Sequence, residues 1–147
     1  MRNSKKGDSM AKEKKKSKKI TKKYLSCYYM AKEEIGVKEI AEEIKEHLPS
    51  IAEKMEFWEA AEVIEIEMGE KSSIDIEKIE LFEDEKDQAF LKKQNICCIF
   101  AINTEESNLA QIKEVFGWVI KKYPGFVCSD SADFLPYILS ADSGKCI

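Results

Sequence analysis

The chain of 147 residues contains one histidine, three prolines and six glycines, and no long apolar run. Neither the GxGxxG pattern of dinucleotide-binding proteins nor the GxxxxGK[ST] phosphate loop occurs. No HExxH motif and no cysteine–histidine spacing typical of zinc sites occurs either. The apolar runs are far shorter than the roughly 20 residues of a membrane-spanning helix. We therefore predict no cofactor, no metal and no membrane insertion.

Five cysteines are present, but they form no CxxC motif and no regularly spaced framework. Cys97 and Cys98 are adjacent within an apolar run, where small buried thiols are common. The sequence also lacks a secretory signal peptide, and 35% of its residues are charged. These features predict a reducing, cytoplasmic environment.

The net charge of −4 conceals two regions of opposite sign. Residues 1–23 carry a net charge of +9 and almost nothing that a core would bury, which predicts a disordered, lysine-rich tail. Residues 24–147 carry a net charge of −13 and have the length and apolar content of a single domain. The protein is thus predicted to be an acidic domain with a basic tail.

Hydrophobic periodicity predicts an α+β domain. In chain order, the predicted elements are a helix at 37–47, a hairpin at 63–81 with its turn at 69–73, a helix at 83–94, a buried strand at 96–102, a helix at 105–123 and a strand at 126–128. This order favours a small, mostly antiparallel sheet of four strands with helices packed on one face.

Several local features accompany this prediction. Residues 24–30 have the apolar content of a strand or of a short helix, and residues 50–56 resemble a continuation of the first helix after Pro49. The apolar phase slips at Lys78, which suggests a β-bulge. Gly117 lies inside the 105–123 helix, where a close contact with the sheet would explain it.

The segment 125–138, GFVCSDSADFLPYI, raises the question of a catalytic or metal site. Cys128 as a nucleophile would need a base, and the one histidine, His47, is distant in sequence. Asp130 and Asp133 as metal ligands do not match the spacing of a calcium loop. Serine and aspartate side chains commonly stabilise turns by bonding to the backbone, so a polar turn is the preferred interpretation.

Acidic residues alternate with apolar ones along both arms of the predicted hairpin. Paired carboxylates serve in acid–base catalysis or in cation binding, but alternation is also typical of the solvent face of an antiparallel sheet. Trp58 precedes the hairpin, and an exposed tryptophan is a common interface anchor. The candidate binding residues are Trp58, Glu65, Glu67, Asp75, Glu77, Asp130 and Asp133.

The tail has its own candidate site. Its lysine block consists of Lys14, Lys15, Lys16, Lys18 and Lys19. Clustered lysines bind polyanions by counterion release, so nucleic acid is a candidate ligand. The tail has no aromatic residue before Tyr24 and no arginine after Arg2, which argues against sequence-specific reading of bases.

Three functions follow from these features. The preferred one is a non-catalytic acidic domain that binds a basic protein, of the kind found among bacterial immunity and antitoxin proteins, because such charge steers encounter with a basic partner. The second is a nucleic-acid- or ribosome-associated protein that acts through the tail. The third is an enzyme that uses Cys128 or His47.

Overall fold

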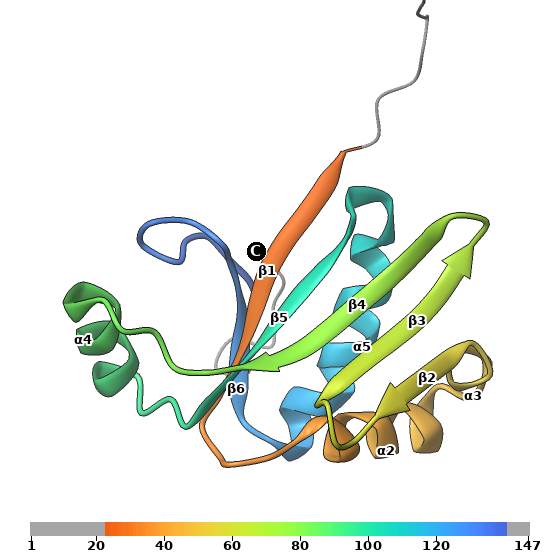
Figure 1. Cartoon of the computed structure of the whole chain (residues 1–147), viewed down its shortest axis with the longest axis horizontal. Coiled ribbons are helices and arrows are strands. Elements are labelled where there is room, and N and C mark those ends of the chain that lie inside the picture. The colour runs from red at the N-terminus through yellow and green to blue at the C-terminus, as the bar shows by residue number, and fades with distance from the viewer. Residues whose placement is uncertain (1–22, 141–147) are drawn as a thin grey trace, which may run out of the picture.

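A computed structural model describes residues 23–140 and shows an antiparallel sheet with helices on both sides (Figure 1). The elements are β1 (Tyr24–Ala31), α2 (Val37–His47), α3 (Pro49–Ala52), β2 (Met55–Trp58), β3 (Val63–Gly69), β4 (Ser72–Ile79), α4 (Glu85–Lys93), β5 (Cys98–Glu105), a 3-10 turn (Glu106–Asn108), α5 (Leu109–Lys122), β6 (Gly125–Ser129) and β7 (Tyr137–Ser140). The strand order is β2-β3-β4-β5-β1-β6-β7, and every neighbouring pair is antiparallel.

The prediction of a four-stranded sheet with helices on one face was wrong, although the α+β class is consistent with the structure. Three of the seven strands come from segments that show no strand pattern. The strand β1 lies between β5 and β6, and separate cores cover its two faces, so apolar and polar residues do not alternate along it. The strands β2 and β7 are edge strands of four residues each, too short to display a period.

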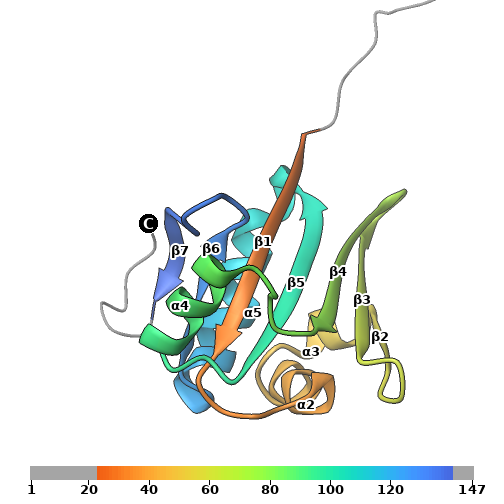
Figure 2. The same ribbon diagram turned by 60° about the vertical axis from the view of Figure 1, so that its left-hand side comes forward.

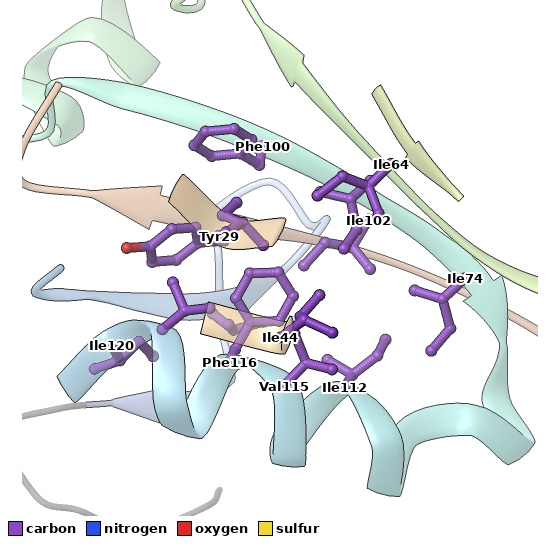
Figure 3. Close-up of a cluster of buried hydrophobic side chains, with 14 of the residues drawn as sticks. Tyr29, Ile44, Ile64, Ile74, Phe100, Ile102, Ile112, Val115, Phe116 and Ile120 are labelled. Atoms are coloured by element: carbon purple, nitrogen blue, oxygen red, sulfur yellow. The ribbon is translucent and has the colours of Figure 1, made fainter. Parts of the chain in front are cut away.

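The first face of the sheet carries the larger core, which α2 and α5 cover (Figure 3). At its centre, the ring of Tyr29 lies 5.1 Å from that of Phe116 and 5.7 Å from that of Phe100. The hydroxyl of Tyr29 donates a 2.6 Å hydrogen bond to the carbonyl of Tyr123, which satisfies the buried polar atom. The helix predicted at 37–47 has these bounds in the structure, because Ile40 and Ile44 form one buried stripe.

The second face is covered over only part of its area. Here α4 packs on β1, β5 and β6, and Leu91 joins Met30, Ile99 and Phe126 in a separate core. Figure 2 shows α4 and α5 on opposite sides of these strands. Because the three strands are apolar on both faces, they require a cover on each side, and α4 provides the second one.

Several predicted details were also wrong. The pairing of β4 with β5 is regular from Asp75 to Ile79, and the register shift lies instead between Glu67 and Gly69 in β3. Lys78 breaks the apolar phase because its ammonium leaves the core to donate a 2.7 Å hydrogen bond to the Ile35 carbonyl and to pair with Glu34.

Two helix boundaries also differ from those that the sequence predicts. The helix after Pro49 ends at Ala52, because the following residues pair with β3 as β2. The helix predicted to begin at residue 105 starts with the 3-10 turn and continues as α5, because β5 pairs with β1 as far as Glu105. A Cβ atom added to Gly117 would meet nothing within 4 Å, so close packing does not explain this glycine.

Candidate functional site

Carboxylates occupy the part of the second face that lies on β2, β3 and β4. Ile64, Ile66, Ile74 and Ile76 point into the first core, so the residues between them point the opposite way. The five exposed carboxylates on this side are Glu56, Glu65, Glu67, Asp75 and Glu77, and we call them the acidic face.

The strand register brings like charges into direct opposition. Glu65 pairs with Glu56 on one side and with Asp75 on the other, which makes a row of three carboxylates across three strands. Glu77 pairs with Val63, and Glu67 pairs with Ser73. Directly opposed like charges destabilise a sheet. The row therefore costs folding stability at its centre.

These carboxylates form no ion pair within the part of the chain that the structure describes, and one basic side chain, Lys54, lies beside the β2 edge. Among residues 23–140, no strand residue on this face is basic. Asp75 accepts a 3.1 Å hydrogen bond from the hydroxyl of Ser73 on its own strand. The acidic face thus presents a concentrated negative charge to solvent.

A hollow of about 260 Å³ adjoins the acidic face at the β2 edge. Its six lining residues are Glu53, Lys54, Met55, Glu56, Glu65 and Glu67. Four of them are glutamates and one is a lysine, so the hollow remains negative. Its size suits a side chain rather than a large ligand.

The structure places Trp58 and Asp130 at opposite ends of this same face. Trp58 lies on the edge strand opposite Val63, with 47% of its surface exposed. Asp130 follows β6, and its backbone N–H donates to the Ser26 carbonyl while its carboxylate accepts a 3.2 Å hydrogen bond from Tyr28. Six of the seven predicted binding residues therefore share a face, with the strands of the sheet between the two ends.

Asp133 is the exception, because it stabilises a loop. Its carboxylate accepts hydrogen bonds of 3.1 Å from the hydroxyl of Ser131 and from the backbone N–H of Leu135. The hydroxyl of Ser131 in turn accepts a 3.1 Å hydrogen bond from the same backbone N–H of Leu135. The segment after β6 is thus a turn held by serine and aspartate side chains, as expected from its composition.

Cys128 and His47 are not brought together. Cys128 lies in the core of the second face, whereas His47 is on α2, which covers the first face, so the sheet separates them. Burial, followed by the charges of Cys27 and Asp130, raises the pKa of the Cys128 thiol to about 12. The thiol is therefore protonated near neutral pH and is a poor nucleophile.

We expect thiol reactivity to follow this burial. At about pH 8, iodoacetamide should modify the exposed Cys97 at least about 100-fold faster than Cys128 or Cys27, whose pKa is also raised to about 12 by burial. Peptide mapping by mass spectrometry gives each rate. Cys98, adjacent but buried, is the matched control and should be protected as well. Equal labelling of Cys97 and Cys128 in the folded protein would contradict the prediction.

His47 belongs to a separate cluster at the end of α2. Its ring stacks on Trp118 with the centroids 3.9 Å apart, and its Nε2 lies 3.5 Å from Oε1 of Glu43. The ligand atoms of Glu43, Glu46 and His47 lie within 4.8 Å of one another, a spacing compatible with a metal ion. However, Lys122 Nζ lies 3.4 Å from the Glu43 carboxylate, which is 4% exposed, and already supplies a positive charge. The cluster is consistent with a structural ion pair.

Glu56 is the residue of the acidic face that sequence reasoning missed. It lies in Met55–Trp58, where Met55 and Phe57 turn to the first core and Glu56 and Trp58 turn away. This alternation was present in the sequence, but four residues are too few to distinguish a strand from the end of a helix.

The lysine block and the rest of residues 1–22 lie outside the described residues. Within residues 23–140, no helix has both the length and the apolar character to cross a lipid bilayer. Comparisons with protein-family models, with curated proteins and with solved structures found no match.

Proposed function

We propose that this protein is a non-catalytic binding domain whose acidic face binds a basic protein partner. Such a mode of action is that of bacterial immunity and antitoxin proteins, which inhibit a partner by occupying its surface. The observation that carries the proposal is the row of opposed carboxylates at Glu56, Glu65 and Asp75, exposed and without an ion pair within residues 23–140.

The energetics of the row support this proposal. Each opposed pair of like charges costs about 0.2–1 kcal/mol relative to neutral residues, and a lysine at one position would remove that cost. Natural sequences generally tolerate such local conflicts at functional sites, where binding compensates for them. A basic partner would provide the missing positive charges.

The surroundings of the row match a protein surface better than a small ligand. The acidic face spans three strands, and Trp58 lies exposed at its edge as a candidate anchor. The net charge of −13 on residues 24–147 would also accelerate encounter with a basic partner. We therefore expect association that weakens as the salt concentration rises.

Affinity capture with three full-length baits tests the proposal. The baits are the wild type, a face variant with Glu65→Gln and Asp75→Asn, and a control with Glu42→Gln and Glu114→Gln. The control removes the same charge from exposed positions on α2 and α5, over the first face. We expect a basic protein to bind the wild type and the control, and to bind the face variant about 3- to 30-fold less, as expected for two interface charges.

Two results would contradict the proposal. Equal recovery on all three baits would show that the acidic face does not select the partner. Recovery of nucleic acid that depends on the lysine block would favour the nucleic-acid-associated function instead. Thermal unfolding of each bait, measured beforehand, ensures that a loss of capture does not reflect a loss of folding.

A further inference from the structure

We infer that the lysine block of this chain binds its own acidic face, so that a basic partner must displace it. This inference rests on the proposed function of the acidic face and adds a means of regulating it. The residues that would meet are the lysines at positions 14–19 and the carboxylates centred on Glu65 and Asp75.

The described chain begins beside the acidic face and on the same side of the sheet. Alternation along β1 turns Tyr24, Ser26 and Tyr28 toward the second face, and Tyr24 is 73% exposed. Ser26 donates a 2.8 Å hydrogen bond to Asn103, which pairs with Asp75. Residues at the start of β1 are therefore in register with the row of carboxylates.

The start of β1 also lies at the matching end of the sheet. Tyr24 pairs with Glu105, and the hydroxyl of Thr104 donates to the Ser73 carbonyl beside the β3–β4 turn. Figure 1 shows the beginning of β1 and this turn at the same end of the strands. The described chain therefore begins at the end of the sheet where β3 turns into β4.

The length of chain before β1 is sufficient to reach the acidic face. The strands β1 and β3 are three positions apart in the sheet, about 14 Å at the usual strand spacing. Lys19 precedes Tyr24 by five residues and Lys14 by ten, so full extension allows about 17 Å and 35 Å respectively. The lysines of the block can therefore reach carboxylates at this distance from β1.

The charges are complementary, and the covalent connection compensates for weak contacts. The lysine block supplies five positive charges, and the acidic face five negative ones. Individual exposed ion pairs contribute little, but a short connection gives the attached segment a millimolar effective concentration. The bound lysine block would then exclude weakly basic proteins from the acidic face. A partner that makes stronger contacts would displace it.

Cross-linking of the full-length protein without a spacer tests the contact directly. A carbodiimide joins a lysine amine to a carboxylate only where the two touch, and mass spectrometry identifies the linked residues. Equal amounts of unlabelled and ¹⁵N-labelled protein are mixed before the reaction. We expect links from the lysine block to Glu65, Glu67 or Asp75 within one copy, abundant at about 50 mM NaCl and at least fivefold fewer at about 1 M.

Other patterns would overturn the inference. Links between labelled and unlabelled copies would assign the acidic face to the segment of a second molecule. Links spread over exposed acids such as Glu42 and Glu114 would show no preference for the acidic face. The face variant Glu65→Gln with Asp75→Asn should also reduce links to the neighbouring Glu67, and an unchanged yield at Glu67 would oppose the inference.

Binding of a synthetic oligolysine peptide tests the regulatory consequence. Replacing the lysine block with glutamines should tighten peptide binding about 3- to 10-fold, because the peptide no longer competes with it. An isocharge control changes five exposed lysines elsewhere to glutamine, at Lys32, Lys38, Lys45, Lys92 and Lys93. An equal gain in both variants would attribute the effect to net charge alone and overturn the regulation.

The two hypotheses fail in different ways. Partner capture that depends on Glu65 and Asp75, without cross-links from the lysine block, would retain the proposed function and overturn this inference. Cross-links within one copy, without any partner that distinguishes the three baits, would retain the contact and contradict the proposed function.

Discussion

The substitution Glu65→Lys is expected to stabilise the fold by about 1 kcal/mol and to weaken partner binding at least tenfold. Glu65 lies between Glu56 and Asp75, so one lysine converts two repulsive cross-strand pairs into two attractive ones. Glutamate and lysine are similarly disfavoured in strands, which leaves the intrinsic propensity nearly unchanged. The same change places a positive charge in the centre of the surface that would meet a basic partner.

Urea denaturation measures the change in stability, and titration calorimetry with the captured partner measures the change in affinity. Glu114→Lys on α5 is the control, because it makes the same change in net charge at an exposed position away from the acidic face. This control should alter both quantities much less. A loss of stability in Glu65→Lys would show that the row of carboxylates is not repulsive. Unchanged affinity would remove Glu65 from the binding surface.

Gly125→Ala is expected to lower the free energy of unfolding by about 3 kcal/mol or more, and the Tm by about 10 °C. Gly125 begins β6 and pairs with Ala31 in the central strand. An added Cβ atom would lie 2.1 Å from the carbonyl oxygen of Met30 and 3.1 Å from the Cα of Ala31. Both are backbone atoms of a strand hydrogen-bonded on each side, so relief requires β1 and β6 to separate.

Gly117→Ala provides the contrast, because it makes the same chemical change in α5, where a Cβ atom meets nothing within 4 Å. Alanine is favoured over glycine inside a helix, so we expect a gain of about 0.5–1 kcal/mol. Thermal and urea unfolding of both variants measures the difference. An equal, small effect of the two substitutions would refute the close contact of β1 with β6.

The candidate binding residues illustrate how much a sequence pattern can predict. Glu65, Glu67, Asp75 and Glu77 alternate with isoleucines, and this alternation alone assigned them to the solvent face of a hairpin. It did not indicate which carboxylates oppose one another, because cross-strand register depends on the turn. The turn at residues 69–73 proved tighter than expected, and the register shift beside Gly69 sets the pairing of Glu65 with Asp75.

Wrong predictions arose where a residue's surroundings come from distant parts of the chain. The segment Tyr24–Ala31 has no apolar–polar period because two cores cover its two faces, and elements some 70 to 100 residues later in the chain contribute to both cores. The apolar residues of α4 show no sign of which face they cover, so the prediction put all helices on one side. For the same reason, the sequence does not show that the sheet separates Cys128 from His47.

The helix at 37–47, the hairpin, the charge of each region and the polar turn after β6 could be predicted from the amino-acid sequence, because each depends on neighbouring residues. The tertiary structure alone decided the central position of β1, the number of strands and the cover that α4 provides. It also decided that Glu56, Glu65 and Asp75 form one row. These features depend on pairing between distant segments, whose energies arise only after the strands meet.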